Sequence, residues 1–190
     1  MSLKNYTTLI VPGLRDHVEQ HWQTLLSHQL IKQGVKTRTV PPLETDKLSL
    51  AARVNAIQHE LAQIEGPVIL VAHSGGCMMV AHWALQSTRP IHAALLAAPA
   101  DLETPLPAGY PVLDDLQAKG WLPVPRQRLP FRSIVVASTN DPLARLERTT
   151  EFARDWGSEL VNAGAVGHLN PASGHGEWPM ALELIETLAS

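Results

Sequence analysis

Short runs of apolar, largely β-branched residues recur along the chain, and the strongest of them end in residues typical of turns. The three clearest runs cover residues 7–11, 68–72 and 133–137, and weaker runs cover residues 36–40, 93–98 and 159–163. Short, continuous apolar runs are typical of parallel strands that are buried on both faces. The pattern therefore predicts six strands.

Between these runs, apolar residues recur every three or four positions, which is the spacing of an amphipathic helix. The clearest cases cover residues 22–33, 50–64 and 180–188. Strands that alternate with helices predict a three-layer α/β fold, because parallel strands need long right-handed crossovers and the helices then cover both faces of the sheet. Ligands of such sheets bind beyond the carboxyl ends of the strands.

The alternation breaks between residues 99 and 130, a stretch that holds seven of the 15 prolines. Since proline interrupts helices, we expect a long irregular excursion here, and such segments are often functional in compact domains. Trp121 lies in this stretch and is our candidate for a wall of the substrate pocket. A buried packing role for Trp121 is an equal alternative.

Composition narrows the class of protein. The chain of 190 residues is long enough for one domain with a sizeable core, and its 45% hydrophobic and 17% charged residues are ordinary for a globular protein. A net charge of −3 offers no basic excess for nucleic acid. Without a signal-peptide pattern or an apolar stretch of about 18 residues, we expect a cytoplasmic protein with no membrane contact. Cys77 is the only cysteine, so an internal disulfide and a thiolate zinc cluster are excluded.

The most informative segment is residues 68–81, in which a strand, a serine between small residues and a helix follow one another. This arrangement is typical of a nucleophile elbow, whose tight turn needs small residues two positions before and after the serine. Here those residues are Ala72 and Gly76, around Ser74. The backbone N–H of Gly75 is then a candidate oxyanion donor. A strand-to-helix turn in some other α/β fold is the alternative.

A serine nucleophile needs a base, and the base needs an acid that orients it. We expect the chain order serine, acid, histidine. Asp141, just past the strand at residues 133–137, is the first candidate for the acid, although Asp141-Pro142 is also compatible with a plain turn. Asp101 follows another strand end and is the second candidate.

His168 is the favoured base because it follows the last predicted strand most closely, and His175 is its competitor. The loop after the first strand is expected to supply the second oxyanion donor, through the backbone N–H of Leu14. A tight turn without a catalytic part is the alternative there.

His17 and His21 are four residues apart and could share a metal on one helix face. Two zinc-protease patterns are nevertheless excluded, because Val18 and Gln20 stand where each pattern needs a glutamate. The chain also lacks the glycine-rich patterns that bind nucleotide phosphates. We therefore expect neither a metal nor a cofactor.

The chain resembles, almost end to end, the small serine hydrolases named after retinoblastoma-binding protein nine, a compact branch of the α/β-hydrolases. The stretches that carry the resemblance include Val11-Pro12-Gly13-Leu14, Val71-Ala72-His73-Ser74, Ala153-Arg154-Asp155-Trp156-Gly157 and Gly167-His168-Leu169-Asn170. The resemblance implies a triad of Ser74, Asp141 and His168 that cleaves small esters or related acyl bonds. Gly75 departs from the leucine that is usual in this family after the serine.

Together, these features predict one domain, residues 1–190, with an α/β-hydrolase-type fold. We expect a six-stranded parallel sheet with strand order 2-1-3-4-5-6, so that the first strand lies beside the elbow strand.

An acyltransferase with the same triad and a non-catalytic protein-binding module remain alternatives. The L-x-C-x-E motif through which eukaryotic relatives are associated with retinoblastoma-type partners is absent around Cys77. The pattern indicates no oligomeric state.

Overall fold

The computed structural model describes residues 2–16 and 18–190. Its centre is a six-stranded parallel sheet with the order β2-β1-β3-β4-β5-β6, so the predicted fold class and strand order are confirmed. The strands are β1 (Thr7–Val11), β2 (Lys36–Thr39), β3 (Val68–His73), β4 (Ala93–Ala97), β5 (Arg132–Ala137) and β6 (Glu159–Asn162).

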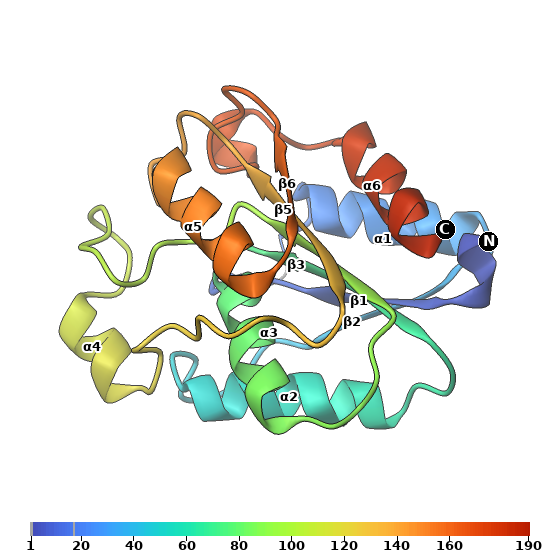
Figure 1. Ribbon diagram of the computed structural model, residues 1–190, viewed down its shortest axis with the longest axis horizontal. Coiled ribbons are helices and arrows are strands. Elements are labelled where there is room, and N and C mark those ends of the chain that lie inside the picture. Colours follow the sequence, from blue (N-terminus) through green and yellow to red (C-terminus); the bar gives the residue numbers. More distant parts are fainter. Residues whose placement is uncertain (1, 17) are drawn as a thin grey trace.

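Helices cover both faces of this sheet. On one face lie α1 (Trp22–Lys32) and α6 (Pro179–Ala189), close to both ends of the chain in Figure 1. The other face is covered by α2 (Leu50–Ala62), α3 (Gly75–Gln86) and α5 (Leu146–Trp156). Side chains of β3 point alternately to the two faces of the sheet. Ile69 and Val71 pack toward α1 and α6. Val68 and Leu70 pack toward α2 and α3.

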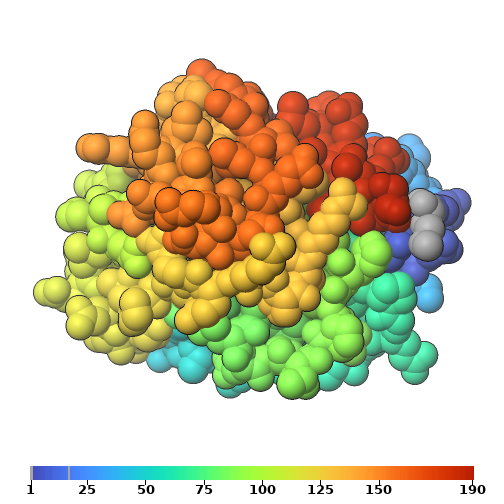
Figure 2. Space-filling model, viewed as in Figure 1, coloured from blue at the N-terminus to red at the C-terminus, as the bar shows by residue number. Residues whose placement is uncertain are grey.

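The proline-rich stretch between residues 99 and 130 is irregular, as predicted, apart from the short helix α4 (Leu113–Ala118). Figure 2 shows its yellow part against the orange α5. Arg126 holds it there through an ion pair with Asp155 of α5, and it also pairs with Glu103 within the stretch. Trp156 of α5 donates its indole N–H to the carbonyl oxygen of Pro125 at 2.8 Å.

Two single turns of 3₁₀-helix complete the fold, η1 (Leu3–Asn5) before β1 and η2 (Pro171–Ser173) before α6. In the described part of the chain, no helix has the length and apolar character needed to cross a lipid bilayer. Because all six strands are parallel, the loops that follow β1, β3, β5 and β6 emerge at one edge of the sheet. Leu14, Ser74, Asp141 and His168 of the candidate site lie in these loops.

Candidate active site

Ser74 lies in the tight turn between β3 and α3, with φ 56° and ψ −125°. This backbone conformation is unusual for a residue with a side chain and is the strained turn expected of a nucleophile elbow. The turn needs glycine at position 76, because a Cβ there would lie 2.5 Å from the carbonyl oxygen of Val11. The N–H of Ser74 donates to the carbonyl oxygen of Ala97 on β4, at 3.0 Å, which ties the turn to the sheet.

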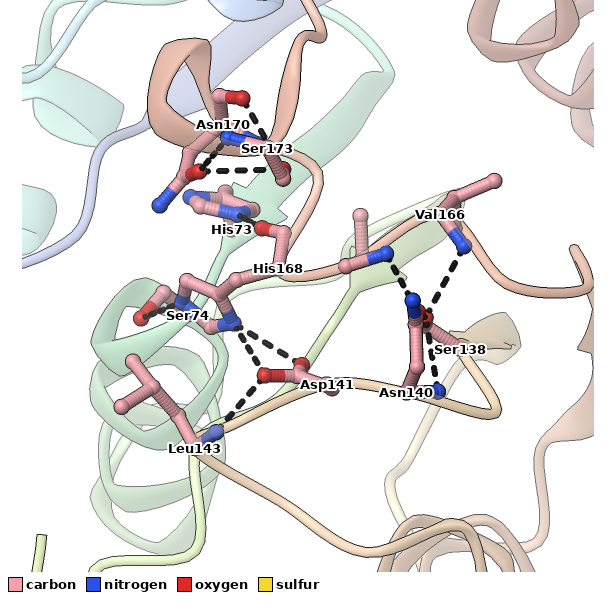
Figure 3. A network of polar contacts seen from close by, with 12 residues as sticks. His73, Ser74, Ser138, Asn140, Asp141, Leu143, Val166, His168, Asn170 and Ser173 are labelled. Atoms are coloured by element: carbon pink, nitrogen blue, oxygen red, sulfur yellow. Dashed lines mark hydrogen bonds and ion pairs between the residues drawn. The ribbon is translucent and has the colours of Figure 1, made fainter. Parts of the chain in front are cut away.

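Three side chains from three loops form one line of hydrogen bonds. The Ser74 hydroxyl lies 2.8 Å from Nε2 of His168, and Nδ1 of His168 lies 2.9 and 2.8 Å from the two carboxylate oxygens of Asp141 (Figure 3). Since a carboxylate only accepts, Nδ1 of a neutral His168 carries the proton, and Nε2 accepts from the serine. The structure thus brings together the three residues that the sequence singles out.

The loops that carry the acid and the base are tied to each other. Asn140 accepts hydrogen bonds on its amide oxygen from the Gly167 N–H at 2.6 Å and from the Ser138 hydroxyl at 2.9 Å (Figure 3). One oxygen of Asp141 also accepts from the Leu143 N–H at 2.8 Å. Asp141 therefore makes the turn expected of an Asp-Pro pair and also orients His168.

His73, the residue before the serine, is buried beneath His168. Its Nε2 donates to the carbonyl oxygen of His168 at 2.8 Å, and the two rings are 4.9 Å apart. The ring of His21 lies 4.7 Å from His73 on the other side. Burial lowers the pKa of His73 well below its usual value, and charge on His168 and His21 lowers this pKa further. His73 is therefore a neutral hydrogen-bond donor.

The two candidate oxyanion donors lie beside each other. A Cβ on Gly75 would be 3.3 Å from Cγ of Leu14 and 3.8 Å from the Leu14 nitrogen, so Leu14 packs directly against Gly75. Gly13 is equally close to the elbow, since a Cβ there would be 3.2 Å from Cβ of Ser74. As the first residue of α3, Gly75 has an N–H with no acceptor within the helix.

A buried arginine holds the loop that carries Leu14. Arg53 of α2 forms an ion pair with Asp16 and reaches the carbonyl oxygen of Leu14 at 3.4 Å. Its Nε donates to the carbonyl oxygen of Lys47 at 2.9 Å. Arg53 could not be identified from the sequence, because an arginine within an amphipathic helix pattern gives no local sign of a distant partner.

Trp121 does not form a wall of the site, and this expectation was wrong. Its side chain is fully buried in the core between the sheet and α2, and its indole N–H donates to the carbonyl oxygen of Leu48 at 2.7 Å. Burial removes apolar surface from water, and the Leu48 carbonyl satisfies the one polar group of the ring. Tyr110, eleven positions earlier in the same stretch, lines the cleft instead.

Asp101 and His175, the second candidates, lie elsewhere. Asp101 is buried and accepts from the Glu103 N–H and the Thr104 hydroxyl, and it forms an ion pair with Arg148. It therefore fixes the start of the proline-rich stretch. His175 follows η2 and is not among the described residues that line the cleft around Ser74.

The cleft over Ser74 has a volume of about 570 Å³. Its lining comes from the loops after β1, β3 and β6 and from the segments around Leu48, Tyr110 and Leu143. Across residues 2–16 and 18–190, no three His, Cys, Asp or Glu side chains are placed to hold a metal ion. His17 lies outside the described residues, so the possible pairing of His17 with His21 stays untested.

Comparisons with known proteins identify the family and the fold. A family model described as serine hydrolase matches residues 8–187. No curated protein matches the chain. Similar solved structures include a YdeN-like hydrolase from Pectobacterium atrosepticum, with 29% identity, a TM-score of 0.77, and 98% and 94% of the two chains covered.

Two further structures share the fold at lower identity. The ydeN gene product of Bacillus subtilis has 17% identity and a TM-score of 0.71, with 96% of this chain and 98% of that chain covered. Est1E from Butyrivibrio proteoclasticus, solved with bound ferulic acid, has 15% identity and a TM-score of 0.71, with 98% and 88% covered. The expectation of a small serine hydrolase is confirmed, whereas the likeness to the branch named after retinoblastoma-binding protein nine stays a resemblance.

Proposed function

The chain belongs to the serine hydrolase family, and we propose that it cleaves a small ester or related acyl bond through Ser74, His168 and Asp141. The observation that carries the proposal is the continuous line of hydrogen bonds from the Ser74 hydroxyl through His168 to Asp141, at 2.8 to 2.9 Å. A serine hydroxyl is a weak nucleophile at neutral pH, and this line of bonds is what activates it.

In the first half of the reaction, the Ser74 oxygen attacks the acyl carbon while Nε2 of His168 takes the hydroxyl proton. Asp141 accepts from Nδ1 and stabilises the imidazolium that forms. His168 then gives the proton to the leaving alcohol, the bond between the acyl carbon and the alcohol oxygen breaks, and the acyl group stays on Ser74.

In the second half, water takes the place of the alcohol. His168 accepts a proton from the water as it attacks the acyl carbon, and the same proton returns to the Ser74 oxygen as the acid leaves. In both halves the carbonyl oxygen becomes negative. The N–H groups of Gly75 and Leu14 are our candidates to stabilise it, a contribution typically worth about 3–4 kcal/mol per donor.

The cleft suits a short acyl group. Its apolar lining includes Leu102, Leu106 and Leu143, and the proline-rich stretch covers it only with residues between Ala100 and Pro111. Trp121, once a candidate wall, is part of the core and adds nothing to this lining. We therefore expect acetyl and butyryl esters to be better substrates than octanoyl esters, because a long chain cannot gain the roughly 0.8 kcal/mol per buried methylene that full cover would give.

The test is the steady-state hydrolysis of 4-nitrophenyl acetate, butyrate and octanoate by the wild type and by Ser74→Ala. We expect turnover of the two short esters, a lower kcat/KM for octanoate, and no turnover by Ser74→Ala. Ser27→Ala, on α1 at the other face of the sheet, is the control and should keep full activity. Equal turnover by wild type and Ser74→Ala would refute the mechanism. Acyl transfer to an added alcohol in preference to water would favour a transferase.

A further inference from the structure

Three charged side chains line the cleft over Ser74, and their charges do not cancel. They are Arg15, Asp16 and Lys47. The carboxylate of Asp16 is neutralised by an ion pair with Arg53. The Arg53 side chain is 6% exposed and is not among the described residues that line the cleft. The two remaining charges, those of Arg15 and Lys47, are both positive.

Neither cation has an anionic partner among the described residues. In the part of the chain that the structure describes, no carboxylate lies within ion-pair distance of Arg15 or Lys47. Some other exposed cations are paired, for example Lys119 with Asp46 and Arg154 with Asp155, and others such as Lys32 are not, but of the unpaired cations only Arg15 and Lys47 are among the described residues that line the cleft. The cleft therefore presents two unneutralised positive charges on a protein whose net charge is −3.

Arg15 is also held in place. Its guanidinium carbon lies 5.0 Å from the centre of the Tyr110 ring, which belongs to the proline-rich stretch across the cleft. A contact with the ring face orients the guanidinium and leaves its N–H donors available for a planar oxyanion. Arg15 and the reacting serine line the same cleft, so these donors face the space that a substrate of Ser74 would occupy.

We propose that the natural substrate carries an anionic oxyanion group, a carboxylate or a phosphate, which Arg15 and Lys47 bind while Ser74 attacks the acyl bond. This inference rests on the proposed function and names its substrate class. The apolar lining binds the rest of a small substrate, and the two cations select its charged end. A positively charged cleft with apolar walls also raises the local concentration of an anionic substrate.

The experiment compares three phenyl acetates that differ only at ring position 3, which carries a carboxylate, a phosphate or a neutral methyl ester. The readout is the ratio of kcat/KM for each anionic ester to kcat/KM for the neutral ester. The intrinsic reactivity of each leaving group is the same in every variant, so it cancels when the ratio is compared between variants. The larger ratio identifies carboxylate or phosphate as the preferred group.

We expect Arg15→Gln and Lys47→Gln each to lower this ratio by about 2- to 5-fold, the range for ion pairs between exposed groups. Arg15→Lys should restore part of it, and added salt should lower it. Lys32→Gln removes the same charge from the exposed end of α1, outside the cleft, and should leave the ratio unchanged.

Unchanged ratios in Arg15→Gln and Lys47→Gln would overturn the proposal, as would an equal loss in Lys32→Gln. The neutral ester separates this failure from failure of the proposed function. If the proposed function is wrong, no ester is turned over in a manner that depends on Ser74. If only the anionic subsite is wrong, the neutral ester is still hydrolysed and charge at positions 15 and 47 has no effect.

Discussion

Nε2 of His73 donates a hydrogen bond to the main-chain carbonyl oxygen of His168 at 2.8 Å, so the residue before the candidate nucleophile holds the backbone of the candidate base. Leucine at position 73 would leave that carbonyl buried without its donor, at a cost of about 1–3 kcal/mol in the free energy of unfolding. It would also remove one of the hydrogen bonds that hold the His168 loop. We expect His73→Leu to lower kcat by about 10-fold with little change in KM, on the premise that a misplaced base costs about 1.4 kcal/mol of transition-state stabilisation.

His73→Gln is the matched variant, because its amide keeps a donor at a similar distance from the backbone. It should recover most of kcat at a temperature at which both variants are folded. A His73→Leu enzyme with wild-type kcat would show that this hydrogen bond has no role in positioning His168.

The two carboxylates considered as the acid have different surroundings, and they should respond differently to the same substitution. Asp141→Asn keeps the shape of the side chain but favours the wrong tautomer of His168, so we expect kcat to fall on the order of 10⁴-fold, as in other triads. Asp101→Asn should leave kcat nearly unchanged and lower the melting temperature, because Asp101 fixes the backbone at Glu103 and pairs with Arg148. The opposite ranking of the two kcat values would transfer the role of the acid to Asp101.

His21 should make the fold sensitive to acid. Burial, and secondarily the charge of His168, lower its pKa from 6.5 to about 4. The unfolded chain therefore binds more protons than the folded one between pH 6.5 and pH 4, and the free energy of unfolding falls as the pH is lowered through this window. His73, whose pKa is also lowered, acts in the same direction.

Asparagine at position 21 removes the titration and keeps a helix-capping side chain, since Nδ1 of His21 accepts the Gln23 N–H at the start of α1. In urea unfolding at pH 7 and pH 5, we expect His21→Asn to lose less stability than the wild type, with a difference on the order of 1 kcal/mol. His28→Asn, exposed on the same helix, is the control and should behave like the wild type. Identical losses in all three proteins would contradict the assignment to His21.

Gly75 and Leu14 should behave as a coupled pair. Alanine at position 75 places its Cβ 3.3 Å from Cγ of Leu14, so the Leu14 loop must move, and with it one candidate oxyanion donor. We expect Gly75→Ala to lower kcat/KM by about 10-fold, a fraction of the 10²- to 10³-fold effect of removing a donor outright. The melting temperature should not fall, because alanine favours the helix.

Leu14→Ala removes the Cγ that the new methyl group would meet. The double variant Gly75→Ala, Leu14→Ala should therefore be more active than Gly75→Ala alone. A double variant whose losses simply add would show that the two side-chain positions do not share this space.

The parts of the fold that follow from local pattern could be predicted from the sequence. The predicted strands end within a residue or two of the observed ends, and their alternation with helices predicts the parallel sheet. The strand order follows from the α/β-hydrolase-type fold that the elbow and the family resemblance imply. Asp141 and His168 were found because each follows a strand end, and parallel strands bring their ends to one edge. Position in the pattern thus located the residues of the candidate site.

What could not be predicted depends on contacts between distant segments. The bond of His73 to His168 joins residues 95 positions apart, and the partner of the Trp121 indole is Leu48, 73 positions earlier. A tryptophan in an irregular stretch is compatible with a cleft wall and with the core, and only its packing decides. The same holds for Arg53, whose ion pair with Asp16 leaves Arg15 and Lys47 as the uncompensated charges of the cleft.

The most direct test of the central claim is covalent labelling by a fluorophosphonate, which reacts with an activated serine and stays bound to it. Mass spectrometry of the digested protein should place the label on Ser74, and labelling should be absent in Ser74→Ala and strongly slowed in His168→Ala. Ser27→Ala should be labelled like the wild type. A wild-type protein that remains unlabelled, or a label that persists in Ser74→Ala, would contradict the assignment of Ser74 as the nucleophile.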